Sequence, residues 1–197
     1  MRAASTTDAG SAVRVIVAGV GYPDLCDYSI GIDAIEALSG WTAPPNVVVE
    51  DLSYNPIAVI QRFEDETPED RFDRAVFVSS VKRGSRPPGS VSCYRWDGVL
   101  PDDDEIHLAI TEAVTGIIAM ENTLIIAQHF KALPPHVIVI EVEPELHEFG
   151  SSRSPAVEAV FDSVCDLLKT FATDDDAVAR LPIQAMEFAS PPGMRVQ

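Results

Sequence analysis

The sequence has few cysteines, and their spacing argues against both a disulfide framework and a zinc site. Cys26, Cys93 and Cys165 are the three cysteines among 197 residues. They form no CxxC pair and no Cys/His cluster, so neither a disulfide framework nor a zinc site is expected. The first twelve residues lack the apolar segment of a secretory signal. No apolar run reaches the roughly 18 residues of a membrane helix. These absences predict a soluble, cytoplasmic protein.

Basic residues are also scarce. There are 14 Lys and Arg residues against 31 Asp and Glu residues, which gives a formal charge of −17. Such a surface repels nucleic acid and anionic lipid, so neither nucleic acid nor membrane is expected as a partner. The charge favours a basic protein or peptide as partner, although acidic surfaces usually serve only solubility. The length is typical of one domain that buries roughly 70% of its unfolded surface.

Apolar, β-branched runs alternate with helical patterns along the chain, which predicts an α/β fold with a mostly parallel sheet. We expect a flexible N-terminal lead over residues 1–12, a single α/β domain over 13–171 and a partly ordered C-terminal tail over 172–197. The expected strands cover 13–19, 46–53, 74–81, 90–96 and 136–144, the fourth as an edge or hairpin strand; the expected helices cover 29–40, 55–65, 154–171 and one long segment within 106–130.

Local signals mark where two of these helices begin. Asn55 and Ser154 are suitable N-caps, and each is followed by a proline at the first helical position. The helix expected over 29–40 carries an apolar stripe on one face. The residues of this stripe are Ile32, Ile35, Ala37 and Leu38.

A glycine turn, "GVGYPD", joins the first expected strand to the first helix. The dinucleotide-binding fingerprint GxGxxG requires a third glycine, but Asp24 stands at that position. Its carboxylate would repel a pyrophosphate near the helix N-terminus. No GK[ST] follows, which excludes a P-loop. A nucleotide site is therefore not favoured.

Four motifs follow one another along the chain and together cover about residues 13 to 170. They are "GVGYPDLCDYSIGIDAIEAL", "DRAVFVSSVKRGSRPPGSV", "PPHVIVIEVEPEL" and "SPAVEAV". In their order and spacing they resemble the nickel–iron hydrogenase maturation endopeptidases. The resemblance implies a three-layer α/β/α sandwich around a five-stranded, mostly parallel sheet.

The resemblance also implies a function. The family removes a short C-terminal extension from the hydrogenase large subunit, and nickel in the substrate is the recognition element. Three side chains reach for it: a Glu or Asp in the first loop, an Asp after the third strand, and a His near the start of the long helix. Carboxylate and imidazole suit such a metal, which can polarise a carbonyl or activate water. No cofactor of the chain's own is implied.

This sequence departs from the family at all three ligand positions. Alignment places Tyr28, Ser79 and Gly116 there, and Tyr22 replaces the family's loop asparagine. Asp27 keeps the first acidic position of the loop. Even if each loss costs only tenfold in affinity, three losses cost at least ~4 kcal/mol. The nickel-dependent mechanism is therefore not expected to operate unchanged.

The first hypothesis is a maturation-protease-like protein that recognises the nickel–iron hydrogenase large-subunit precursor or its C-terminal extension. It would act as a pseudo-protease or assembly factor, or as the partner of an active paralogue. The cleft would lie at the carboxyl edge of the sheet. The expected substrate-binding residues are Tyr22, Asp27, Tyr28, Ser79, Ser80 and Gly116.

Two further hypotheses stay open. One is an active endopeptidase with a relocated metal site, in which Asp24 or Asp27 acts with His107. It predicts that these carboxylates and the imidazole converge within metal-bonding distance. Glu112 and Glu121 also lie in or near the long helix. The other is a small-molecule binder or enzyme that reuses the scaffold, with an enclosed apolar pocket.

Nucleophilic catalysis is disfavoured. Cys26, Ser79 and Ser80 lie near the expected site, but each would need a base within hydrogen-bond reach. No histidine is expected there, because the three histidines outside the expected site lie near element ends and look structural or exposed. They are His129, His136 and His147.

Overall fold

The computed structural model describes residues 12–186, in which six strands form one sheet. The strand order is β2-β1-β3-β5-β4-β6. The first four of these strands are parallel, β4 is antiparallel to β5, and β6 pairs parallel to β4. The mostly parallel sheet is as expected, but it has a sixth strand. The strands are β1 (Val15–Gly19), β2 (Val47–Asp51), β3 (Arg74–Ser80), β4 (Val91–Trp96), β5 (His136–Val142) and β6 (Ile183–Gln184).

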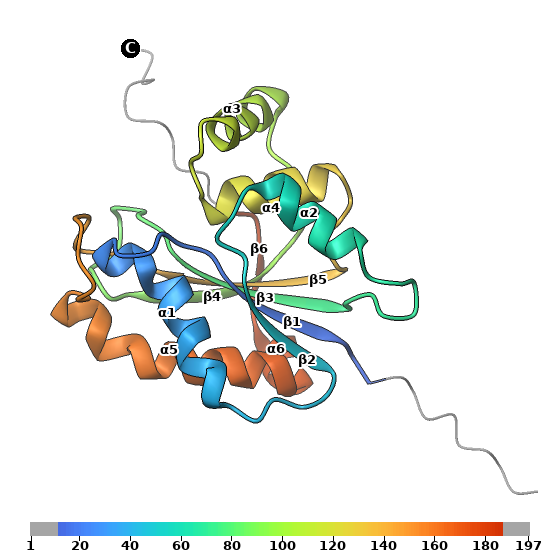
Figure 1. Cartoon of the computed structure of the whole chain (residues 1–197), viewed down its shortest axis with the longest axis horizontal. Coiled ribbons are helices and arrows are strands. Elements are labelled where there is room, and N and C mark those ends of the chain that lie inside the picture. Colours follow the sequence, from blue (N-terminus) through green and yellow to red (C-terminus); the bar gives the residue numbers. More distant parts are fainter. Residues whose placement is uncertain (1–11, 187–197) are drawn as a thin grey trace, which may run out of the picture.

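Helices cover both faces of the sheet (Figure 1). One face carries α1 (Ile30–Ala37), which follows the short 3₁₀ turn Cys26–Ser29, together with α5 (Pro155–Thr173) and α6 (Asp175–Arg180). The other face carries α2 (Pro56–Glu64) and α4 (Met120–His129). A further helix, α3 (Asp103–Val114), packs on α4 rather than on the sheet. This is the expected three-layer sandwich with one additional outer helix.

Side chains of the strands alternate between two hydrophobic cores. Val15 and Val17 of β1 pack with α1 and α5, whereas Ile16 and Ala18 pack with α2 and α4. Both sets are fully or almost fully buried. A strand covered on both faces has no position for a polar residue, which explains the continuous apolar run.

The predicted helix starts are confirmed. The side chain of Asn55 accepts a hydrogen bond from the amide of Ile57 at 2.8 Å. The side chain of Ser154 accepts one from the amide of Val157 at 3.3 Å. Each cap satisfies an amide that has no partner within its own helix.

The single long helix expected within 106–130 is wrong, because two helices occupy this segment. The first ends at Val114 and the second begins at Met120. Between them Gly116 has a φ of +88°, a left-handed conformation that glycine adopts without steric cost and that commonly ends helices. Gly116 thus separates two helices in a segment whose apolar pattern predicted one continuous helix.

The stripe expected on the first helix is also only partly right. Ile30, Gly31 and Ala34 are the buried residues of α1, and Leu38 is buried just after it, whereas Ala37 is exposed and Ile32 and Ile35 are half-buried. The helix lies against β1 on its smallest residues. Close approach of backbones, rather than the width of the apolar stripe, decides which face is buried.

The segment after residue 171 adds to the fold. There α5 continues to Thr173, and α6 and β6 follow. The expected lead over residues 1–11 and the last part of the expected tail, 187–197, lie outside the described residues. Among residues 12–186, none of the helices has the length and apolar character needed to cross a membrane.

Candidate functional site

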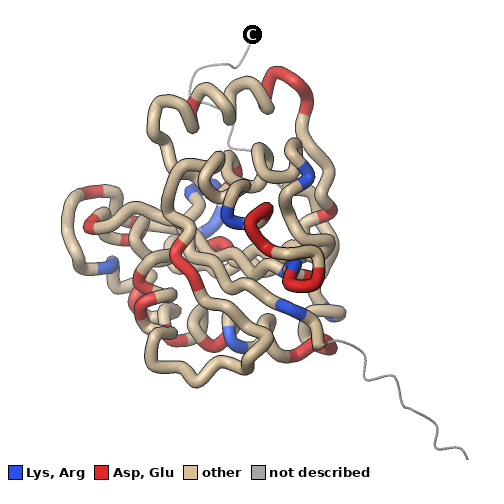
Figure 2. The backbone as a smooth tube through the Cα atoms, turned by 45° about the vertical axis from the view of Figure 1, so that its right-hand side comes forward, with Lys and Arg blue, Asp and Glu red and all other residues tan. Residues whose placement is uncertain are grey.

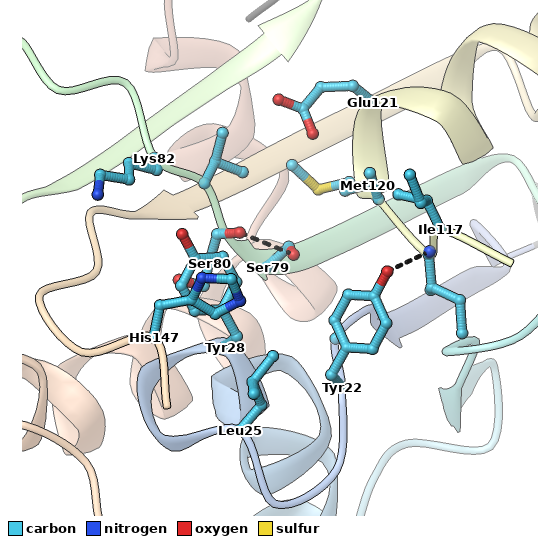
Figure 3. A pocket seen from close by; sticks show the side chains of 14 residues that line it. Tyr22, Leu25, Tyr28, Ser79, Ser80, Lys82, Ile117, Met120, Glu121 and His147 are labelled. Carbon is cyan, nitrogen blue, oxygen red and sulfur yellow. Dashed lines mark hydrogen bonds between the residues drawn. The ribbon is translucent and has the colours of Figure 1, made fainter. Parts of the chain in front are cut away.

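The connections of the sheet place a crevice at the carboxyl ends of β1 and β3. From β1 the chain runs through α1 to β2 on one side, and from β2 it returns through α2 to β3 on the other side. Ligands of open α/β sheets bind outside such a switch point. A cleft of ≈ 460 Å³ lies there (Figure 3). Its lining includes Tyr22, Tyr28, Ser79, Ser80, Glu121 and His147.

The glycine turn brings strand and helix together and does not cradle a phosphate. A Cβ on Gly19 would lie 2.2 Å from the carbonyl oxygen of Gly31, and one on Gly31 would lie 2.3 Å from that of Val20. The amide of Gly21 already donates to the hydroxyl of Ser53 at 3.0 Å. These glycines are therefore needed for backbone packing.

Asp27 lies behind the cleft rather than in its lining. Its side chain is fully buried. One carboxylate oxygen accepts from the amides of Glu145 and Leu146, both at 2.8 Å, and the other accepts from the amide of Ser154 at 2.7 Å. Burial by itself raises the pKa of Asp27, but the three backbone hydrogen bonds bring it below its usual value. The ionised carboxylate thus fastens the loop after β5.

Tyr28 lines the cleft and contacts His147, which this loop carries. The two ring centroids are 4.4 Å apart, at an interplanar angle of 40°. Burial raises the pKa of Tyr28, and the negative charges of Glu143, Asp27 and Glu121 raise it further. The phenol is therefore neutral at physiological pH. His147 is exposed, as expected, yet it borders the site, which the sequence analysis missed.

Tyr22 joins the cleft to the loop between α3 and α4. Its hydroxyl accepts a hydrogen bond from the amide of Ile118 at 2.5 Å (Figure 3). Gly116 itself does not line the cleft, but Ile117 and Ile118 do. The position expected to contribute a ligand therefore contributes a turn that brings apolar side chains to the rim.

Replacing Tyr22 by phenylalanine is expected to release this loop. The amide of Ile118 loses its acceptor, which costs about 1 kcal/mol for a hydrogen bond of this kind. Hydrogen exchange at the Ile118 amide should then accelerate by about fivefold, because protection of a loop amide follows its local opening free energy. Tyr54→Phe is the matched control, and it should leave this amide unchanged. Equal exchange rates in wild type and Tyr22→Phe would contradict the role assigned to the hydroxyl.

Ser79 and Ser80 end β3 at the floor of the cleft. The hydroxyl of Ser79 donates to the carbonyl oxygen of Ser80 at 3.4 Å. The hydroxyl of Ser80 is buried without a hydrogen-bond partner in the described part of the chain. Neither is bonded to a histidine, and Cys26 is buried. Within residues 12–186, therefore, no candidate nucleophile is paired with a base.

Glu121 lines the cleft, although the sequence analysis named it only beside the relocated metal site and not among the expected substrate-binding residues. It lies in the first turn of α4 and borders the cleft (Figure 3). Its carboxylate pairs with Arg83 at 3.2 Å. Burial raises the pKa of Glu121, and the charge of Arg83 opposes that rise. The sequence held a signal: Glu141 and Glu143 interrupt an apolar strand, which normally requires buried positive partners.

Those partners come from the loop "KRGSR". Arg83 also pairs with Glu141 at 2.5 Å, and Arg86 pairs with Glu141 at 2.8 Å. The hydroxyl of Tyr94 donates to Glu141 at 2.9 Å, which together with the arginines holds the pKa of this carboxyl below its usual value despite burial. The loop after β3 is thus held beside the cleft by the ion pairs of its arginines with the buried carboxylate of Glu141.

The residues at the three family ligand positions do not suit nickel. Tyr28 is a neutral phenol, Ser79 offers a neutral hydroxyl, and Gly116 has no side chain. Asp24 and His107 are exposed, and both oxygens of Asp27 already accept backbone amides. Within the described range, no three His, Cys, Asp or Glu side chains gather in a way that could hold a metal ion.

The fold is shared with solved structures of known function. No protein-family model and no curated protein matches the chain. The hydrogenase 2 maturation peptidase from a Thaumarchaeota archaeon is 25% identical, over 79% of this chain and 95% of that one, with a TM-score of 0.55. The hydrogenase maturating endopeptidase HybD from E. coli is 21% identical, over 79% and 90%, with a TM-score of 0.59. The endopeptidase HycI from Escherichia coli is 19% identical, over 90% and 100%, with a TM-score of 0.59.

Proposed function

We propose that this chain, which has the fold of the hydrogenase maturation endopeptidases and resembles that family, acts in nickel–iron hydrogenase assembly. It binds the large-subunit precursor or its C-terminal extension in the cleft at the carboxyl edge of the sheet. One observation carries the proposal: the cleft is present, while Tyr28, Ser79 and Gly116 stand at the positions where the resemblance places metal ligands. The chain is thus a pseudo-protease or assembly factor, alone or with an active paralogue.

The cleft suits a peptide segment. Apolar side chains form much of its wall, among them Leu25, Ile117 and Met120. The hydroxyl of Tyr28 can hydrogen-bond to a peptide backbone. Such contacts give affinity without bond cleavage, so loss of the metal ligands removes the chemistry and leaves recognition.

The binding test uses the large-subunit precursor of the native host and the purified chain. Tyr28→Ala is expected to weaken binding at least tenfold, because it removes an aromatic wall and the surface on which His147 packs. Trp41→Ala is the control. It also removes an aromatic side chain, but Trp41 precedes the amino end of β2, whereas the cleft lies at the carboxyl ends of the strands. Calorimetry measures both. Equal affinities of the two variants would contradict a binding role of the cleft.

The intact mass of the precursor tests the chemistry. After incubation with the purified chain, the precursor is expected to keep its C-terminal extension. Loss of the extension would instead support an active endopeptidase. In the host, an unchanged precursor mass in strains with and without the gene would argue against any role in processing.

A small-molecule role is the second candidate, because ≈ 460 Å³ is also within the range of small-ligand sites. If the precursor does not bind, while a metabolite raises the unfolding temperature of the wild type but not of Tyr28→Ala, this candidate replaces the proposal.

A further inference from the structure

Helix α3 presents more apolar surface than the rest of the fold covers. Ile106, Ala109 and Ala113 are buried against α4. A second stripe on the same helix points outward. It consists of Ile110, Val114 and, just beyond the helix, Ile117, which are 38%, 80% and 42% exposed. We call these three residues the α3 ridge.

The α3 ridge is continuous with the cleft. Ile117 belongs to both, because it is exposed and also lines the cleft. The next residue, Ile118, is fixed to Tyr22 through its amide. Helix α3 projects beyond the three layers of the sandwich (Figure 1). A segment that leaves the cleft at Ile117 therefore meets the ridge next.

The start of α3 is strongly acidic. Asp102, Asp103, Asp104 and Glu105 are consecutive and exposed, and the helix contains no lysine or arginine. The run lies at one end of the uppermost helix (Figure 2). Capping explains one of the four, since Asp102 accepts from the amide of Glu105 at 3.0 Å. Among the described residues, none of the four forms an ion pair at the distances of a salt bridge.

We infer that the α3 ridge and the acidic run at residues 102–105 form one docking surface for a basic amphipathic segment of a protein partner. The inference rests on the proposed function in one respect, namely that this segment belongs to the partner whose peptide enters the cleft. The apolar side chains of the segment lie on the ridge beside the cleft. Its lysines and arginines lie at the far end of α3, against the carboxylates.

The dimensions and charges of α3 select this kind of occupant. Twelve helical residues span about 18 Å, which accommodates a partner helix of about three turns. An acidic or neutral helix would bury the ridge equally well, but it would be repelled by, or indifferent to, four carboxylates. A basic one gains electrostatic attraction that steers association and weakens as salt rises.

A synthetic 18-residue amphipathic helix of leucine and lysine is the probe, and its counterpart of leucine and glutamate is the comparison. The lysine peptide is expected to bind the full chain at least tenfold more tightly than the glutamate peptide, and less tightly at 300 mM than at 50 mM salt. Val114→Asp should weaken binding at least tenfold. Leu108→Asp is the matched control, because Leu108 is 39% exposed on the other side of α3; it should change binding less than twofold.

Equal binding of the two peptides, or equal loss in Val114→Asp and Leu108→Asp, would overturn the inference. The large-subunit precursor is measured with the same variants. If it does not bind the wild type while the peptide results hold, the proposed function fails and the docking surface stands. If it binds but the peptides show no preference, the docking surface fails and the proposed function stands.

Discussion

Replacing Asp27 by alanine is expected to lower the free energy of unfolding by about 4 kcal/mol. The variant removes the acceptor of the amides of Glu145, Leu146 and Ser154, of which the contact to Ser154 is buried and the other two are partly buried. A hydrogen bond to a charged group contributes about 1.5–3 kcal/mol, and hydration of the two partly buried amides recovers part of the total. Urea unfolding measures the change. A loss of that size is a large share of the stability of an ordinary domain.

Asp33→Ala is the matched control for Asp27→Ala. Asp33 lies on α1 and pairs with Arg153 near the surface. A partly exposed pair of this kind contributes less than about 1 kcal/mol. Similar losses in the two variants would show that the amide contacts of Asp27 do not hold the loop.

The same carboxylate makes stability depend on pH. The pKa of Asp27 is lowered in the folded chain, so its contribution is fully present above the unfolded value of about 3.9. The contribution is lost as the pH falls through the folded value. As the pH falls below about 4, the free energy of unfolding should therefore decrease more in the wild type than in Asp27→Ala. Parallel profiles of the two proteins would contradict this assignment.

The role of Asp27 also limits its use as a functional probe. From the sequence, Asp27→Ala would separate a binding protein from an enzyme with a relocated metal site. In the structure, that change releases the loop that carries His147. Any lost activity or binding would then reflect loss of the loop. Tyr28→Ala is the more direct variant.

Replacing Arg83 by methionine is expected to cost about 3–5 kcal/mol. Arg83 pairs with Glu121 and Glu141, whose side chains are 15% and 4% exposed. Breaking a buried ion pair by removing one partner leaves uncompensated charge in a poorly solvated place. Denaturant unfolding at pH 7 measures the loss.

Two comparisons distinguish this electrostatic effect from a general loss of stability on replacing an arginine. Arg62→Met removes a more exposed arginine that pairs with Glu50 and Glu66, and it should cost less than about 1 kcal/mol. Adding Glu121→Gln to Arg83→Met should recover part of the loss, because one of the stranded charges disappears. Without Arg83 the pKa of Glu121 rises further, so the deficit should shrink as the pH falls toward the unfolded value of about 4.3. A deficit independent of pH would contradict the charge-based account.

Much of the fold could be predicted because its signals are local. β-Branched runs marked the strands, and Asn55 and Ser154 marked two helix starts. The resemblance added the three-layer order, which the solved structures confirm. The missed features depend on backbone conformation: Gly116 splits a helix, and α1 packs through Gly31.

The site was harder to predict because its contacts join distant segments. Tyr22, Tyr28, Ser79 and Ser80 border one cleft at the carboxyl edge of the sheet, where the family resemblance had placed them. His147 and Glu121 join them from loops and helix ends that no local pattern connects. Asp27 was assigned to the cleft, yet its partners are 118 to 127 residues away and turn its carboxylate inward.

Residue type and short spacing were enough to predict the alternation of strands and helices, the acidic charge and a glycine turn that does not suit a phosphate. The three layers and the replaced ligand positions were what the family resemblance implied. Which carboxylates are buried and hydrogen-bonded, and which face the cleft, depends on tertiary contacts. The reason is physical: the pKa and the role of an acidic side chain depend on which amides and guanidinium groups surround it, and these come from remote parts of the chain.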